Sequence, residues 1–206
     1  MVEAERVRRI YERMAPRYDR GMDVVERLLF SGGRDWVCER ANGATLEVAV
    51  GTGRNIGRYR ADVRLTGIDA SPAMLARAQR RADSLEATVV LREGDAQRLD
   101  FPDECFDSVV VTLGLCTIPD DGAAVAEMAR VLRPGGKWLA LEHTASPRPL
   151  VRAAQGLADP LAGRLGADHL LRRPEALIAA AGLVIDEAER SALGITLRLA
   201  AHKPGP

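Results

Sequence analysis

Short apolar runs alternate with amphipathic segments along the middle of the chain. Five of these runs are brief, rich in Val, Ile and Leu, and bounded by Gly, Asp or Pro, which is typical of strands. They lie at residues 45–50, 63–69, 87–95, 106–116 and 137–143. Amphipathic segments that predict helices separate them, at residues 54–60, 71–85 and 120–136. Because strands that alternate with helices form βαβ units, the pattern predicts an α/β domain with a doubly wound, parallel sheet.

Local signals mark the ends of two of these helices. Ser71 is expected to cap the helix at 71–85, and Pro72 suits its first turn. The helix at 120–136 is expected to end at Pro134-Gly135-Gly136, because proline and glycine interrupt helices.

The two ends of the chain depart from this alternation. Residues 3–14 predict a helix, the run at 15–23 predicts a break, and residues 23–41 predict a second helix. Near the other end, residues 182–190 and 194–203 predict two strands. Their connection is too short for a helical crossover, so the two strands should pair antiparallel.

We expect residues 1–206 to form a single domain with two covering segments. The helices of 1–42 should lie over the ligand site. The segment 146–182 contains Pro and Gly but no strand pattern, and should cross the carboxyl edge of the sheet as a helical lid over the substrate. Its apolar side chains suit a small apolar substrate, although any packed helix would carry them: Leu150, Val151, Leu157, Leu161, Leu165, Leu170 and Leu171.

Gly51 and Gly53 follow the first strand, where ligands bind in doubly wound sheets. A dinucleotide-binding turn needs a third glycine at position 56, but Ile56 stands there and Gly57 comes one residue late. A P-loop needs a second glycine followed by Lys, and no Lys follows here. Both phosphate-binding interpretations are therefore weakened.

The acidic strand that ends in Gly51-Thr52-Gly53 resembles the first motif of the class I S-adenosylmethionine-dependent methyltransferases. The segments "LTGIDAS", "EGDAQRL" and "EMARVLRPGGKWLALEH" follow in the order that this family shows. "YERMAPRYDRGMD" resembles the ubiquinone/menaquinone-biosynthesis methyltransferases, while "TLGLCTIPD" and "LEHTASPRPL" are closer to the thiol and phosphatidylethanolamine methyltransferases. The chain departs from the family at Ala49, where glycine is frequent, and at Val50, where Cys or Gly is frequent.

The resemblance implies a seven-stranded sheet of order 3-2-1-4-5-7-6, with the last strand antiparallel, and S-adenosyl-L-methionine as cofactor. The glycine turn would cradle the amino-acid end of the cofactor, Asp69 would accept hydrogen bonds from the ribose, and Asp95 would approach the adenine amino group. Met74 would either cover the adenine or belong to the helix core, and Tyr11 and Tyr18 would each either cover the cofactor or serve as packing residues. The implied cofactor-binding residues are Tyr18, Glu47, Ala49, Gly51, Thr52, Gly53, Asp69, Ala70, Met74, Gly94, Asp95, Ala96, Thr112 and Leu113.

Composition narrows the choice of partners and compartment. The 29 basic and 29 acidic residues balance, and aromatic residues make up only 4%, so we expect no nucleic-acid partner. Three scattered cysteines without a CxxC pair predict no metal site and favour a reducing compartment. With no apolar run of about 20 residues and a charged N-terminal segment, we expect no transmembrane span, no signal peptide and a cytoplasmic location. Contact with a membrane surface and the oligomeric state stay open.

The acceptor side offers fewer signals. His143 and His169 are candidate general bases, since histidine titrates near neutral pH, but either could be structural. Cys116 is expected to line the pocket, because methyl transfer is a direct displacement and needs no enzyme nucleophile. We therefore predict methyl transfer to a small, apolar thiol, phenol, quinol or amine. The alternatives are a non-catalytic protein that binds the cofactor or a partner, and an NAD-linked oxidoreductase.

Overall fold

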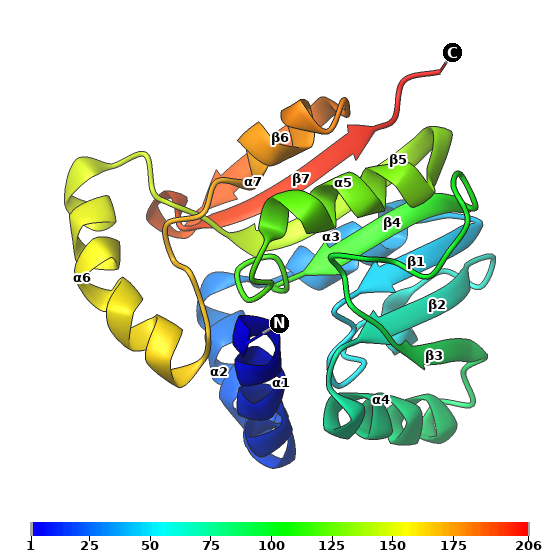
Figure 1. Ribbon diagram of the computed structural model, residues 1–206, viewed down its shortest axis with the longest axis horizontal. Helices are drawn as coiled ribbons and strands as arrows, with labels where there is room; N and C mark the ends of the chain where they lie inside the picture. Colours follow the sequence, from blue (N-terminus) through cyan, green and yellow to red (C-terminus); the bar gives the residue numbers. More distant parts are fainter. Residues whose placement is uncertain (1, 206) are drawn as a thin grey trace.

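The computed structural model describes residues 2–205, and its centre is a seven-stranded sheet (Figure 1). The strand order is β3-β2-β1-β4-β5-β7-β6, which confirms the order implied by the resemblance. The parallel strands are β1 (Ala44–Val48), β2 (Arg64–Asp69), β3 (Val89–Glu93), β4 (Phe106–Thr112) and β5 (Leu132–His143). The hairpin strands β6 (Val184–Ser191) and β7 (Thr196–His202) pair antiparallel, and β7 also pairs antiparallel with β5.

Helices cover both faces of the sheet, as the apolar strands predicted. One face carries α3 (Gly33–Arg40) and α4 (Pro72–Ser84), and the other carries α5 (Asp121–Val131) and α7 (Pro174–Ala180). Side chains of β4 alternate between the two faces: Val109 and Val111 pack in the cluster of α5, and Val110 packs in the cluster of α3. This two-sided burial explains why the run 109–111 has three valines in succession.

The remaining helices gather at one edge of the sheet. Because the five parallel strands share a direction, their carboxyl ends meet at the left of Figure 1. On this side lie α1 (Val2–Met14), the 3₁₀ turn η1 (Ala15–Arg17), α2 (Tyr18–Leu29) and α6 (Pro149–Leu165). Short 3₁₀ turns also occur at η2 (Ile56–Arg58), inside the predicted helix 54–60, and at η3 (Ala192–Gly194) in the hairpin. The site therefore has to be sought at this edge.

The N-terminal helices break at a different place from the one we expected. Residues 15–17 alone form the irregular turn, and α2 begins at Tyr18, inside the predicted break. The second break lies within the predicted helix 23–41, at Gly32, whose φ of +69° is left-handed. Glycine adopts this conformation without the steric cost that a side chain would add, so the chain turns there between α2 and α3.

Two further predictions need correction. The helix predicted to reach Pro134-Gly135-Gly136 ends at Val131, and residues 132–136 extend β5. Two backbone hydrogen bonds hold this extension: Gly135 N–H donates to the Lys203 carbonyl, and Lys203 N–H donates to the Gly136 carbonyl. The segment 146–182 does not lie wholly over the carboxyl edge, because α7 packs on the α5 face, where Ile178 is fully buried.

Candidate functional site

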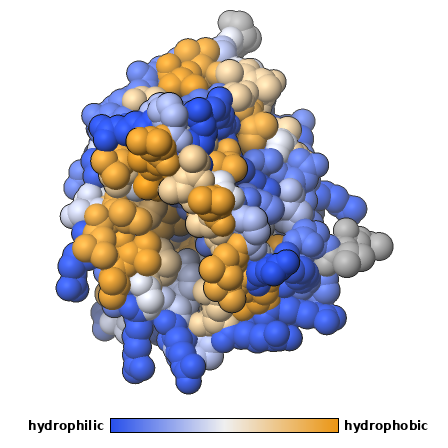
Figure 2. Space-filling model, turned by 90° about the vertical axis from the view of Figure 1, so that its left-hand side faces the viewer, coloured by the Kyte–Doolittle hydropathy of each residue, from blue (hydrophilic) through white to orange (hydrophobic). Residues whose placement is uncertain are grey.

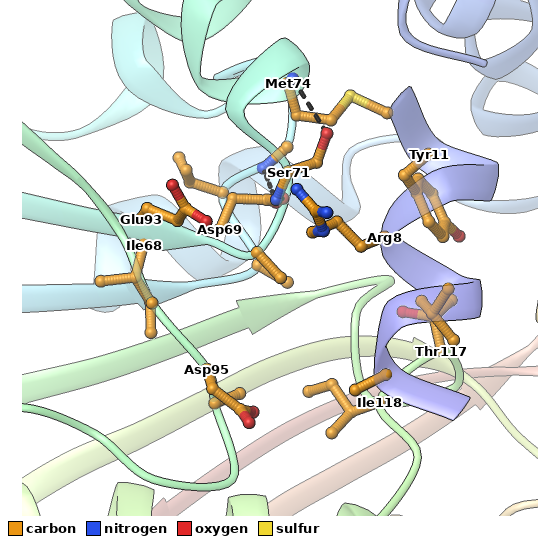
Figure 3. Close-up of a pocket in the computed structure, with 18 of the residues that line it drawn as sticks. Arg8, Tyr11, Ile68, Asp69, Ser71, Met74, Glu93, Asp95, Thr117 and Ile118 are labelled. Carbon is orange, nitrogen blue, oxygen red and sulfur yellow. Dashed lines mark hydrogen bonds between the residues drawn. The ribbon is translucent and has the colours of Figure 1, made fainter. Parts of the chain in front are cut away.

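A cavity of about 820 Å³ opens at the carboxyl edge of the sheet, within the size range of small-molecule sites. The ends of β1, β2 and β4 form its floor, and α1 forms the opposite wall (Figure 3). Thirteen of the fourteen predicted cofactor-binding residues line it: Tyr18, Glu47, Ala49, Gly51, Thr52, Asp69, Ala70, Met74, Gly94, Asp95, Ala96, Thr112 and Leu113. The fold thus brings together residues that are scattered along the chain.

The turn after β1 provides the open part of the floor. Ala49 and Gly51 both have left-handed backbones, with φ of +57°. A Cβ on Gly51 would meet no atom nearer than the Ala49 carbonyl oxygen at 3.9 Å, so that position is open space. A ligand can approach the Gly51 backbone closely, and a longer side chain there would fill the cradle.

Gly53 is the one predicted cofactor residue that does not line the cavity. A Cβ there would lie 2.5 Å from Cδ1 of Ile56 and 3.1 Å from Cα of Ala78. The missing side chain therefore allows α4 to pack against the turn. The prediction of a cofactor contact at Gly53 becomes, on this geometry, a packing role.

Asp69 joins the glycine turn to the start of α4. Its Oδ2 accepts a hydrogen bond from the Gly51 backbone N–H at 2.8 Å, and its Oδ1 accepts one from Ser71 N–H at 2.9 Å. Ser71 caps α4, as predicted, by accepting from Met74 N–H (Figure 3). Burial raises the pKa of Asp69. Because each carboxylate oxygen has a second lone pair, Asp69 can still accept hydrogen bonds from a ligand.

Glu47 is held rigidly beneath the cavity. Asn55 donates to its Oε1 at 2.9 Å and Tyr59 donates to its Oε2 at 2.8 Å. Burial raises its pKa to about 7. Asn55 also donates to Thr112 and accepts from Arg34. Both carboxylate oxygens of Glu47 have partners, so the residue organises the site as well as lining it.

Polar contacts fasten the N-terminal helices to the glycine turn. Thr52 donates its hydroxyl to Asp19 of α2 at 2.6 Å, and Arg81 of α4 pairs with the same carboxylate at 2.7 Å. These bonds set Tyr18 in the cavity wall, where its ring centroid lies 6.1 Å from that of Tyr11. These contacts hold α2 beside the glycine turn, whereas α3, which also belongs to the segment 1–42, covers a face of the sheet.

A second group of polar side chains lies beyond the ends of β4 and β5. Cys116, His143 and Asp168 each offer an atom within 4.8 Å of the other two. The Cys116 thiol is hydrogen-bonded to Asp168 Oδ1 at 3.6 Å, and burial raises its pKa well above the ordinary value. Among residues 2–205, neither ring nitrogen of His143 has a hydrogen-bond partner, and burial lowers its pKa to about 4. His143 is therefore a neutral imidazole at pH 7 with both nitrogens available.

This acceptor-side cluster (Cys116, Glu142, His143 and Asp168) includes two acids that sequence reasoning missed, Asp168 and Glu142. Glu142 is fully buried, and its Oε1 accepts from the backbone N–H groups of Gly114 and Leu115. Burial raises its pKa to about 7, and its Oε2 has no partner within the described chain. An acid in the otherwise apolar run "LALEH" was the available signal.

The two candidate bases differ in placement. His143 belongs to the acceptor-side cluster, whereas His169 is exposed and contributes only its backbone N–H, which donates to the Cys116 carbonyl. Neither imidazole lines the main cavity. Arg8 and Thr117, which sequence reasoning also missed, do line it, from α1 and from the loop after β4 (Figure 3).

The charges of the cavity fit a cation better than a phosphate. Three arginines reach the lining, but the described structure pairs each with an acid: Arg8 with Glu5 and Glu12, Arg34 with Glu26, and Arg54 with Asp19, Asp23 and Glu26. Six acidic residues line the same space: Glu3, Glu5, Glu47, Asp69, Glu93 and Asp95. A sulfonium nucleoside carries a positive charge and hydroxyl donors that suit these acids, whereas the pyrophosphate of a dinucleotide would be repelled.

Comparison with known proteins gives consistent matches. The family model described as a methyltransferase domain matches residues 46–140. A phosphatidylethanolamine N-methyltransferase from Cereibacter sphaeroides is 44% identical over 119 residues, which are 56% of this chain and 59% of that protein. A demethylmenaquinone methyltransferase from Deinococcus radiodurans is 34% identical over 188 residues, which are 86% of this chain and 73% of that protein. A solved S-adenosylmethionine-dependent methyltransferase from Thermotoga maritima has a TM-score of 0.72 at 19% identity, with 95% of this chain and 99% of that chain covered.

The strand order, the residues that line the cavity and the matched relatives all indicate the same family. The chain spans less than two thirds of the first relative named above and nearly three quarters of the second. The strand order 3-2-1-4-5-7-6 is shared with the structural neighbours of this fold. The chain belongs to the class I S-adenosylmethionine-dependent methyltransferases.

Proposed function

We propose that this chain transfers a methyl group from S-adenosyl-L-methionine to a small apolar acceptor with a thiol, phenol, quinol or amine group. The cofactor supplies an electrophilic methyl group on a sulfonium. The observation that carries the proposal is the position of the acceptor-side cluster. The cluster lies next to the cavity, because Thr117, which follows Cys116 in the chain, lines the same cavity as the carboxylates of Asp69 and Asp95.

The cofactor end is assigned to residues that fit its chemistry. Asp69 is positioned to accept from the ribose hydroxyls, and the open space at Gly51 suits the amino-acid end. Asp95 and Ala96 would serve the adenine edge, and the buried Met74 would lie against its face. Tyr18, held through α2, would close the cavity over the amino-acid end.

The acceptor end is assigned to His143, with Glu142 beside it. A neutral, unpartnered imidazole can accept a hydrogen bond or a proton from an acceptor S–H, O–H or N–H group. The protein would otherwise align the acceptor and exclude water, since methyl transfer is a direct displacement. The relatives carry names of an aminophospholipid and a menaquinone precursor, and both names support an apolar acceptor with a reactive head group.

The test has a cofactor arm and an acceptor arm. Calorimetric titration should show S-adenosylmethionine binding that Gly51→Val abolishes and that Asp69→Ala weakens by roughly 1.5–3 kcal/mol, the range for a charge-assisted hydrogen bond. Release of S-adenosylhomocysteine should then be measured with an alkyl thiol, a phenol, a naphthoquinol and an aliphatic amine.

A matched histidine pair separates chemistry from structure. His143→Asn should lower kcat on the active acceptor and leave cofactor affinity unchanged, while His169→Asn, at the exposed histidine, should change neither. Binding of S-adenosylmethionine without turnover of any acceptor would favour a non-catalytic binding protein, and tight binding of NAD would favour an oxidoreductase.

A further inference from the structure

The helix α6 presents its polar side to the protein and its apolar side to solvent. Gln155 is buried, and it bonds the backbone of Thr144, Ser146 and Leu170. Asp159 also points inward and accepts from Leu170 N–H at 2.6 Å. The leucines at helical spacing on the other side are exposed, with Leu157 87% exposed: Leu150, Leu157, Leu161 and Leu165. This polarity is the reverse of that of an ordinary surface helix.

The helix α2 shows the same inversion. No residue of α2 is buried. Its acids Asp19 and Glu26 turn toward Arg54, Arg81 and Arg34 of the body of the protein. Its apolar residues are left exposed: Val24, Val25, Leu28 and Leu29, of which Leu28 is 74% exposed.

Exposed arginines accompany these apolar side chains on both helices. Those that form no ion pair within the described chain are Arg20 and Arg27 of α2, Arg164 of α6, and Arg17 and Arg148, which directly precede these two helices. Asp19 and Glu26 are occupied by inward contacts, and Asp23, whose side chain is 57% exposed, is paired with Arg54. The outer side of the two helices is therefore mainly apolar, and its unpaired charges are positive. Figure 2 looks at this side of the molecule and shows hydrophobic side chains gathered on it, with hydrophilic ones at its margin.

We propose that this apolar edge surface, formed by the exposed sides of α2 and α6, rests on a lipid bilayer with anionic head groups. Leucine and arginine on one exposed face are what interfacial helices present to lipid. A second copy of the chain fits less well, because a symmetric contact would bring the same arginines of both copies together. Among residues 2–205 no helix has the length and apolar character to cross a bilayer, so the contact is peripheral.

The apolar edge surface lies on the side of the protein where the cavity opens. The two helices stand at the carboxyl edge of the sheet, where the cavity opens. Arg6 of α1 donates to the Gly163 carbonyl near the end of α6, so α6 adjoins the wall of the cavity. A bilayer on this face would bring lipid-dissolved molecules to the site. The proposal itself does not depend on methyl transfer.

The test is flotation of the full chain with vesicles of phosphatidylcholine that contain about one third phosphatidylglycerol, a composition with the negative surface that the arginines require. The double variant Leu157→Glu/Leu161→Glu should bind at least about tenfold more weakly, because two apolar contacts become charged. Arg20→Gln/Arg27→Gln should weaken binding mainly at low salt. The matched control is Val184→Glu, which also replaces an exposed apolar residue. Val184 pairs with His202 in the terminal hairpin, at the opposite edge of the sheet from α2 and α6.

Thermal unfolding and cofactor titration of every variant would establish that each is folded. Wild-type protein that stays unbound with these vesicles would overturn the proposal, and so would a leucine double variant that floats as well as the control. Equal binding to pure phosphatidylcholine would overturn the role given to the arginines. If sedimentation shows a dimer that the leucine double variant dissociates, the surface is an interface between copies, and the lipid assignment is wrong.

Discussion

Replacing Glu142 with glutamine should remove part of the pH dependence of stability. The carboxyl is 1% exposed, and burial raises its pKa from 4.5 to about 7. The folded state therefore holds this proton more tightly than the unfolded state does. The resulting contribution to stability is fully present below the unfolded pKa and is lost as the pH rises through about 7.

The size of the effect follows from the shift. A rise from 4.5 to about 7 corresponds to about 3 kcal/mol, at about 1.4 kcal/mol for each pKa unit. Glutamine cannot ionise, and its Oε1 can still accept from Gly114 and Leu115 N–H. The amide nitrogen of the glutamine would take the place of Oε2, which has no partner within residues 2–205. No described donor therefore lies against the new amide N–H groups. As the pH rises from 5 to 8, the free energy of unfolding of Glu142→Gln should therefore increase by about 3 kcal/mol relative to that of wild type.

Urea unfolding at both pH values measures this difference directly. Glu189→Gln, at an exposed position on β6, is the control and should follow wild type at each pH. If Glu142→Gln loses stability between pH 5 and pH 8 as steeply as wild type does, then Glu142 is ionised in the folded protein. A positive charge close to the carboxylate of Glu142 would then have to stabilise its ionised form.

Three further substitutions test the site's framework. Gly53→Ala should cost about 2–4 kcal/mol in urea unfolding, because the new Cβ would meet Ile56 and Ala78 and the backbone is left-handed; a loss below about 1 kcal/mol would contradict the packing role. Ser71→Ala should cost about 1 kcal/mol through the lost helix cap, and an unchanged midpoint would show that the cap is redundant. Arg34→Met should cost about 1–3 kcal/mol, because the buried Asn55 Oδ1 loses its donor, while Glu26 keeps Arg54 as a partner; equal stability by thermal unfolding would refute this.

The strands were predictable because sheet burial leaves a mark on local sequence. The run 109–111 is apolar on both sides, and helices cover both faces there. The extension of β5 through Gly135 was not predictable, since Pro and Gly usually interrupt regular structure. A partner distant in sequence, Lys203, holds it through backbone hydrogen bonds. The turn at Gly32, in contrast, had a local signal in Ser31-Gly32-Gly33, because Ser-Gly and Gly-Gly pairs mark turns.

Some residues of the candidate site could likewise be placed from the sequence, and others could not. Acids at strand ends, such as Asp69 and Asp95, could be placed because carboxyl ends of parallel strands meet at one edge. Arg8 could not, because nothing in a charged helix shows which cavity it will cover. The leucines of α6, such as Leu157, were expected to face the substrate and are exposed instead. An amphipathic pattern shows that a helix has two sides, and the surrounding fold decides which of them faces inward.

The helix α1, which forms one wall of the cavity, is expected to undergo local opening more readily than the rest of the protein. Within residues 3–14 no side chain is fully buried, and most ion pairs of the helix are internal, as between Arg8 and Glu5. Such a segment opens at a small fraction of the global unfolding free energy. Its amide hydrogens should exchange with deuterated solvent well before those of β4, and a ligand gripped beneath the helix should slow that exchange selectively. Exchange in residues 2–14 therefore gives a direct measure of how firmly the cavity is closed.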